Sequence, residues 1–284
     1  MDQKTLARNI SKIENEASGF EDLLTSLPPG KKSPVLGITG APGAGKSTLV
    51  DALIGQLVAS NKKVAVLCVD PSSPFNLGAV LGDRIRMSNW YTNPNVFIRS
   101  LATRGSLGGL HPKIIEITDL LQSAGFDYII VETVGVGQSE IEIAGLADVT
   151  VVVVVPEGGD EVQTMKAGLM EIADIFVVNK SDRPNADLFV KNLQLMSRHL
   201  PVIKTVATEN KGIEELVRSI NEIEAKHLEN DHKYWLLTER AYQLIAKKRM
   251  EDVRREELME KIKTLSARGD FNLYEFVSRF TPHA

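Results

Sequence analysis

A glycine-rich octapeptide between a strand-like and a helix-like segment constrains this chain more than any other feature. Residues 35–39 are mostly apolar, as in a buried strand, and residues 46–60 have the composition of a helix. The segment between them matches GxxxxGK[ST] in full, as Gly40, Ala41, Pro42, Gly43, Ala44, Gly45, Lys46 and Ser47. In this context the glycines let backbone N–H groups surround phosphate oxygens, while the lysine contacts the β- and γ-phosphates and the hydroxyl binds Mg²⁺. With Thr48 at the start of the helix, the motif predicts a nucleoside triphosphate site.

Short Val- and Ile-rich segments alternate with helical segments from residue 34 to about residue 218. The strand candidates are residues 35–39, 64–70, 96–100, 128–133, 149–156, 175–179 and 202–206. The helix candidates between them are residues 46–60, 112–124, 162–173, 186–199 and 213–226. Strands that are apolar on both faces are typical of a parallel sheet covered by helices on each side. The alternation therefore predicts a doubly wound α/β fold with a mostly parallel sheet.

Helical segments are predicted on either side of this α/β region. Near the N-terminus, Leu6, Ile10 and Ile13 recur at spacings of four and three and share one helix face. Residues 221–268 are rich in Glu, Lys, Arg and Leu and lack Pro, which predicts a long helix or a helical hairpin. Its apolar stripe could pack on its own domain or on another subunit. We expect an N-terminal helical extension at 1–30, a nucleotide-binding domain at 31–220 and a C-terminal helical arm at 221–284.

A tetrapeptide after the sixth strand candidate indicates which base is bound. Asn179, Lys180, Ser181 and Asp182 match the NKxD pattern of GTPases, about 130 residues after the phosphate-binding motif. A carboxylate at Asp182 can accept hydrogen bonds from guanine N1–H and the 2-amino group. Adenine offers neither donor, so an adenine nucleotide would leave that acceptor unpaired. The pattern predicts guanine specificity.

Three acidic residues lie at strand or loop ends, where they could bind Mg²⁺ or orient the attacking water. Asp70 and Glu132 end strand candidates, and Asp83 lies in the segment GDRIRM. Carboxylates at the carboxyl edge of a parallel sheet point into the ligand crevice. Hydrolysis needs Mg²⁺ on the phosphates and a group that orients water. Gly135, within VETVGVGQ, would allow the backbone to approach the γ-phosphate and to change conformation after its loss.

Two further groups of residues have more than one interpretation. Arg99, Arg104 and Lys113 surround a glycine-rich segment at 103–109, and they could form a solvated basic loop or contact phosphates or a partner. Asp160 precedes a helix candidate and suits a helix N-cap, which does not account for the neighbouring Glu161 and Lys166.

Composition excludes several classes of function. There are 33 basic and 37 acidic residues, for a net charge of −4, which argues against a general nucleic-acid binder. The single cysteine excludes a disulfide framework. The longest apolar run, residues 149–156, is too short to span a membrane, and the acidic N-terminal segment suits neither a signal peptide nor a transit peptide. We expect a soluble, cytoplasmic protein with no membrane or nucleic-acid partner.

At the level of longer motifs the chain resembles a known family. These motifs are GITGAPGAGKSTLVDAL at 37–53, VAVLCVDPSSP at 64–74, LGDRIRM at 81–87, FIRSLATRGSLGGL at 97–110, VETVGVGQSE at 131–140, GDEVQTMKAG at 159–168 and EIADIFVVNKSDR at 171–183. Together they resemble the MeaB/ArgK family, the MMAA-like P-loop GTPases of the SIMIBI, metallochaperone-type class. Members act as chaperones of adenosylcobalamin-dependent acyl-CoA mutases, such as methylmalonyl-CoA mutase.

The resemblance implies roles for individual residues. The positions that gather around Mg²⁺ and the catalytic water in the family are Ser47, Asp70, Asp83 and Glu132. The resemblance implies that Lys46, Asp83 and Glu132 are catalytic. Asn179, Lys180 and Asp182 match the guanine-binding residues, and the backbone amide of Ala207 would contact the guanine oxygen. The segment 158–168 matches a switch that signals to the mutase through Asp160, Glu161 and Lys166. The chain departs from the family pattern at Leu77, Ser106 and Val206.

Taken together, residues and resemblance predict a Mg²⁺-dependent GTPase that gates adenosylcobalamin loading and protects a cobalamin-dependent mutase. The family's C-terminal arm usually forms a homodimer, and residues 222–284 could do so here. Three alternatives stay open: a nickel-insertion-type maturation GTPase, a transport-linked ArgK-type hydrolase or kinase, and an interaction module whose nucleotide is structural. A nickel-insertion-type GTPase would be expected to carry Cys/His clusters, which the sequence lacks. The NKSD segment argues against an ATP-dependent kinase.

Overall fold

The computed structural model describes residues 1–28, 33–70, 87–103, 110–134, 140–156, 167–197, 199–225, 231–250 and 252–278. By its internal contacts the chain forms two compact units, Met1–Leu236 and Leu237–Ala284. The first unit contains the sheet and every residue that the sequence analysis assigns to a site.

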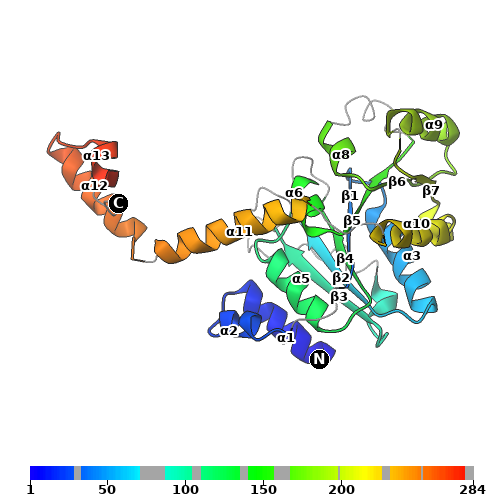
Figure 1. Ribbon diagram of the computed structural model, residues 1–284, viewed down its shortest axis with the longest axis horizontal. Helices are drawn as coiled ribbons and strands as arrows, with labels where there is room; N and C mark the ends of the chain where they lie inside the picture. Colours follow the sequence, from blue (N-terminus) through cyan, green and yellow to red (C-terminus); the bar gives the residue numbers. More distant parts are fainter. Residues whose placement is uncertain are drawn as a thin grey trace. The chain divides into compact units, whose positions relative to one another are not determined.

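Seven strands of the described residues form one sheet in the first unit (Figure 1). They are β1 (Val35–Gly40), β2 (Val64–Asp70), β3 (Val96–Ala102), β4 (Tyr128–Glu132), β5 (Val149–Val154), β6 (Ile175–Val178) and β7 (Val202–Lys204). Their order is β3-β2-β4-β1-β5-β6-β7, and each neighbouring pair is parallel. The predicted doubly wound α/β fold is confirmed. Because β4 and β5 lie on either side of β1, the loop after β1 sits where ligands bind in such sheets.

Helices connect the strands and extend the chain at both ends. In the first unit they are α1 (Gln3–Glu14), α2 (Phe20–Thr25), α3 (Lys46–Ala59), α5 (Ile114–Ser123), α6 (Glu140–Leu146), α8 (Ala167–Ile172), α9 (Ala186–Ser197) and α10 (Ile213–Glu224), with short 3₁₀ turns η1 (Ser88–Trp90) and η2 (Ala207–Glu209). The strand and helix candidates all correspond to observed elements, with ends that differ by a few residues. Helix α6 was not predicted, because its seven residues follow the strand β4 without a periodic apolar pattern long enough to recognise.

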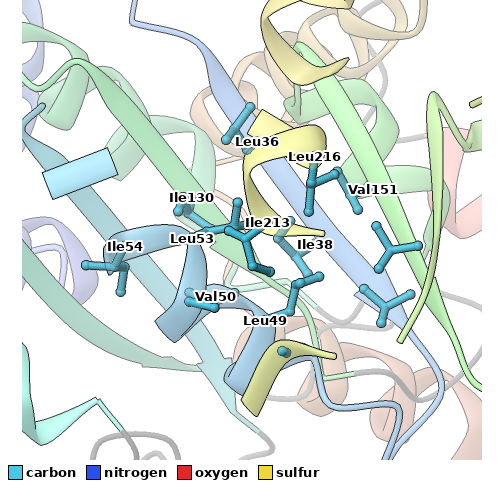
Figure 2. Close-up of a cluster of buried hydrophobic side chains, with 14 of the residues drawn as sticks. Leu36, Ile38, Leu49, Val50, Leu53, Ile54, Ile130, Val151, Ile213 and Leu216 are labelled. Carbon is cyan, nitrogen blue, oxygen red and sulfur yellow. The ribbon is translucent and has the colours of Figure 1, made fainter. Parts of the chain in front are cut away.

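Alternate residues along the strands enter different hydrophobic clusters, of which the described residues form three. In β2, Val64, Val66 and Cys68 enter the core with α3 and α10, whereas Ala65 and Leu67 enter the opposite core with α1 and α5. Figure 2 shows part of the first core, where side chains of α3, α10 and the central strands meet. Since both faces are covered, these strands carry apolar residues without a polar alternation.

Within the first unit, helix α1 packs against α5 through the face predicted from its spacing. Leu6, Ile10 and Ile13 are buried in the core formed with α5. At the edge of that core, Arg99 of β3 pairs with Glu14 and donates a hydrogen bond to Ser11 Oγ (3.0 Å).

The sequence also left the role of Lys113 open, and in the structure this residue binds the N-terminal segment. Its Nζ lies 2.7 Å from Glu16 Oε1, and it sits 5.1 Å from the centre of the Phe20 ring. Both Arg99 and Lys113 therefore hold the N-terminal extension, whereas Arg104 lies outside the described residues. These two residues pair with acidic side chains and do not form a solvated basic loop.

The division between the two units falls within α11 (Asp231–Arg249), and the second unit also contains α12 (Arg255–Ala267) and α13 (Leu273–Ser278). The predicted long helix or hairpin is thus two helices with a break near residue 250. In the second unit the Phe271 and Phe276 rings pack 5.9 Å apart. Among the described residues, none of the helices has both the length and the apolar character needed to cross a bilayer.

Candidate functional site

The glycine-rich loop joins the carboxyl end of β1 to the first turn of α3, as its motif predicts. Gly40 has φ +139°, and a Cβ there would lie 2.1 Å from the carbonyl oxygen of Val153 in β5. Gly45 has φ +90°, and its Cβ would lie 2.4 Å from Asn179 Nδ2. The loop passes too close to its neighbours, in the wrong backbone region, for any other residue at either position. Such a tight turn is what a phosphate-binding loop requires.

Lys46 lies inside this loop. Its side chain is buried, and Nζ donates hydrogen bonds to the carbonyl oxygens of Gly40 (2.9 Å) and Ala41 (3.2 Å). These bonds hold the ammonium group over the turn that precedes α3. A cation in that position, beside the N-terminus of a helix, makes the loop electropositive and attractive to a phosphate chain.

Two predicted acidic residues lie at the carboxyl edge of the sheet, at the ends of β2 and β4. Ser47 Oγ donates a hydrogen bond to Glu132 Oε1 at 2.7 Å, and both side chains are buried. Glu132 is paired in register with Cys68, so Asp70, two residues further along β2, extends beyond it at the same edge. Asp70 is also buried, at 5% exposure. A hydroxyl and two carboxylates form a hard oxygen donor set of the kind that Mg²⁺ prefers.

Close to these acids, two threonines join the strand ends of β1 and β4. Thr133 Oγ1 donates to Thr39 Oγ1 at 2.9 Å, and both residues are buried. The backbone N–H of Thr133 also donates to the carbonyl oxygen of Ile38 at 3.0 Å. These bonds fix the exit of β4, and with it Glu132, against the strand that leads into the phosphate-binding loop.

Asn179 connects the phosphate-binding loop to the loop after β7. Its side chain is 2% exposed. Nδ2 donates to the carbonyl oxygen of Ala44 at 3.0 Å, while Oδ1 accepts from Thr205 Oγ1 at 3.1 Å and from the backbone N–H of Ala207 at 3.2 Å. Through this one amide, residues 135 positions apart in the sequence are held in a fixed relation.

The other residues of the NKSD segment are positioned next to Asn179. Lys180 has φ +57°, and its Nζ donates to the carbonyl oxygen of Gly43 at 2.8 Å. The N–H of Ser181 donates to the carbonyl oxygen of Thr205 at 3.0 Å. Asp182 is exposed at the end of the segment. The lysine thus spans from the NKSD segment back to the phosphate-binding loop, and the carboxylate of Asp182 stays accessible from solution.

Several predicted residues lie outside the described part of the chain. They are Asp83, Gly135, Asp160, Glu161 and Lys166, together with the departures Leu77 and Ser106. Of the predicted site, the structure therefore brings together the residues of the loop at 40–48, the acids Asp70 and Glu132, the NKSD segment and Ala207. Within the described residues, no group of three or more His, Cys, Asp or Glu side chains could hold a metal ion.

Sequence reasoning missed Thr205. This residue is fully buried and contributes both its hydroxyl, to Asn179, and its carbonyl oxygen, to Ser181. The available signal was its place near the carboxyl end of a predicted parallel strand, at the edge where ligand-binding residues gather. The Val206 departure leaves the Ala207 N–H in its contact with Asn179.

Comparison with known proteins agrees with the resemblance seen in the motifs. The family model described as "Methylmalonyl Co-A mutase-associated GTPase MeaB" matches residues 6–266. A protein named as a GTPase in Pyrococcus abyssi is 45% identical over 276 residues, which cover 93% of this chain and 80% of that protein. GTPase ArgK of Escherichia coli is 37% identical over 236 residues, or 77% of this chain and 71% of ArgK.

Among solved structures, one titled as an LAO/AO transport system kinase aligns with 99% of this chain and 97% of its own, with a TM-score of 0.63. At 24% identity this likeness supports the fold alone. The family model covers most of the chain, and the curated relatives are similar over most of their own length. The chain therefore belongs to the MeaB family, and it is a P-loop GTPase.

Proposed function

We propose that GTP binds along the carboxyl edge of the sheet, with its phosphates on residues 40–48 and its base between the NKSD segment and Ala207. The observation that carries this proposal is the amide of Asn179, which bonds the phosphate-binding loop at Ala44 and the Ala207 N–H at once. One side chain thereby sets the spacing between the two ends of the nucleotide. Phosphate and base are then recognised by a single preorganised site.

Guanine recognition would divide between two groups. The Asp182 carboxylate would accept from N1–H and the 2-amino group, and the Ala207 N–H would donate to O6. Lys180, held against Gly43, would line the side of the base. An adenine nucleotide presents an amino group where guanine has O6 and lacks the 2-amino group. It would therefore place a donor against the Ala207 N–H and leave the Asp182 carboxylate without its donors.

Magnesium would be held by Ser47, Asp70 and Glu132, joined by Asp83. The donor set fits a hard cation, since Ser47 and Glu132 already meet at 2.7 Å and Asp70 lies at the same sheet edge. When bound, Mg²⁺ neutralises charge on the β- and γ-phosphates. Lys46 would stabilise the same charge, while Glu132 and Asp83 would orient the attacking water.

The output of this hydrolysis would be a signal to a partner enzyme. The matched family is described as mutase-associated, which supports an adenosylcobalamin-dependent acyl-CoA mutase, such as methylmalonyl-CoA mutase, as the client. As a chaperone, the protein would gate cofactor loading and protect the loaded mutase. The segment containing Asp160, Glu161 and Lys166 would carry the nucleotide state to that partner.

We also propose the three-part organisation stated above, with the arm at 221–284 forming a homodimer. This proposal is supported by the large apolar side chains that the arm exposes. They are Tyr234, Trp235, Leu237, Tyr242, Leu244, Ile245, Met250, Met259, Leu273, Tyr274 and Val277. Light scattering during size-exclusion chromatography would test it, with a dimer expected at twice the 31.2 kDa of the chain.

GTP hydrolysis by the purified protein, alone and with a panel of cobalamin-dependent mutases, tests the function. We expect slow turnover alone and strong stimulation by one mutase. Glu132→Ala should abolish the stimulated rate, whereas Glu171→Ala, an exposed glutamate of α8, should not change it. Tight GTP binding without stimulation by any mutase would place the client outside this enzyme class. Equal competition by ATP would contradict the guanine site itself.

A further inference from the structure

The turn after β7 carries an ion pair beside the base-recognition segment. Val206 and Lys211 pair as an antiparallel bridge, with Val206 N–H to Lys211 O at 3.2 Å and Lys211 N–H to Val206 O at 3.3 Å. Asn210 adopts the left-handed region at φ +56°, and Gly212 follows at φ +78°. A Cβ at Gly212 would lie 2.0 Å from the carbonyl oxygen of Lys204. The backbone of this turn is therefore closely constrained.

The same turn is tied to the guanine-recognition residues. Ala207, the first residue of η2, donates its N–H to Asn179, and the neighbouring Thr205 accepts from Ser181 N–H at 3.0 Å. Asp182 is the next residue after Ser181. The turn therefore cannot shift far from Asp182 without breaking these bonds.

Two carboxylates influence the ammonium group of Lys211. Its Nζ pairs with Glu209 Oε2 at 2.6 Å, and this ion pair is largely exposed. The hydrogen bond and charge of Glu209, with a smaller contribution from the charge of Asp182, raise the pKa of Lys211. The backbone bonds of this turn hold Lys211 near the segment that contains Asp182, and the ion pair of Lys211 is with Glu209.

This choice of partner matters because a lysine that paired with Asp182 would occupy the acceptor that guanine needs. A carboxylate engaged by an ammonium group accepts other hydrogen bonds less strongly, and the lysine would have to be displaced before a base could bind. A competing carboxylate on the same turn prevents this by holding the lysine elsewhere. The arrangement resembles a built-in restraint on a residue that would otherwise block the site.

We propose that Glu209 is a positioning residue for guanine recognition, which holds Lys211 away from Asp182 and so keeps the Asp182 carboxylate available to the base. This inference rests on the proposed role of Asp182. It names residues outside the NKSD segment that set how well that segment selects guanine.

The test compares GDP with IDP, whose base lacks only the 2-amino group that Asp182 would bind. Removal of a hydrogen bond to a charged group predicts that the wild-type protein binds GDP roughly 10- to 100-fold more tightly than IDP. In Glu209→Gln the shape is kept and the charge is lost, so Lys211 turns to Asp182. We expect the GDP-to-IDP affinity ratio to fall about two- to fivefold, the range of exposed ion pairs.

The variant Lys211→Met tests the same idea by removing the lysine itself. With no lysine to restrain, this variant should keep the wild-type ratio, and the double variant Glu209→Gln, Lys211→Met should recover it to within about twofold. General damage to the turn would weaken GDP and IDP equally, so the ratio separates positioning from structural loss. A Glu209→Gln protein with an unchanged ratio, or a double variant that fails to recover, would overturn the proposal.

The same titrations separate this inference from the proposed function. If wild-type protein and Asp182→Ala bind GDP and IDP with the same ratio, then Asp182 does not read the 2-amino group, and both conclusions fail. If Asp182→Ala loses the discrimination but Glu209→Gln retains it, only the role of Glu209 is wrong. Isothermal titration calorimetry with GDP and IDP provides all of these values.

Discussion

Replacement of Asn179 by alanine should disconnect the two ends of the nucleotide site. The wild-type side chain makes three hydrogen bonds, to Ala44 O and from Thr205 Oγ1 and Ala207 N, and all three partners are buried. At about 1 kcal/mol each, their loss should lower the free energy of unfolding by about 3 kcal/mol. If GDP must then order both loops itself, its affinity should fall by up to about 100-fold, since each 1.4 kcal/mol is tenfold.

Two measurements on the nucleotide-free protein and its GDP complex check this reasoning. Urea unfolding gives the free energy of unfolding, and calorimetric titration gives the GDP affinity. Thr205→Val removes one of the three bonds and should cost about a third as much. Asn192→Ala, an exposed asparagine on α9, should change neither quantity. A stable Asn179→Ala protein with wild-type GDP affinity would refute the view that this amide preorganises the site.

Three further predictions concern other parts of the chain. Gly45→Ala should destabilise the nucleotide-free protein more than Gly43→Ala, because both have positive φ but only the Gly45 Cβ would strike Asn179, at 2.4 Å; thermal unfolding of the two variants decides. Ile10→Ala should cost about 2–5 kcal/mol in urea unfolding, since Ile10 is fully buried. Burial raises the pKa of Glu142, so its ionisation at neutral pH opposes folding. Glu142→Gln should therefore be more stable than wild type at pH 7, with an advantage that disappears below the ordinary value of 4.5; equal stabilisation at every pH would contradict this.

The N-terminal helix illustrates why packing partners were harder to predict than elements. The spacing of Leu6, Ile10 and Ile13 was enough to predict a buried face. It did not indicate that Arg99 and Lys113 would bind Glu14 and Glu16. Those pairs form because β3 lies at the sheet edge, where α1 packs against α5, and strand order is not encoded in any local pattern.

The C-terminal region shows a second limit. A stretch without proline, rich in Leu, Glu and Lys, predicts a long helix or a helical hairpin, because most of its residues favour the helical state. The observed break between α11 and α12 falls at residues with no strong breaker. Helix propensity is a weak preference that tertiary contacts override, so composition could not decide between one helix and two or give the position of the break.

By itself the sequence determined the chemistry of the site: glycines where the loop turns, a lysine and a serine that follow, strand-end acids, and an NKSD segment after a buried strand. These features depend on residues that are neighbours in the chain, where backbone conformation and side-chain period follow local rules. Only the tertiary structure decided that Asn179 contacts Ala44, and that the turn after β7 is bonded to the NKSD segment. Contacts between distant segments depend on the order of strands in the sheet. Local sequence patterns do not fix that order, because the same patterns are compatible with several strand orders.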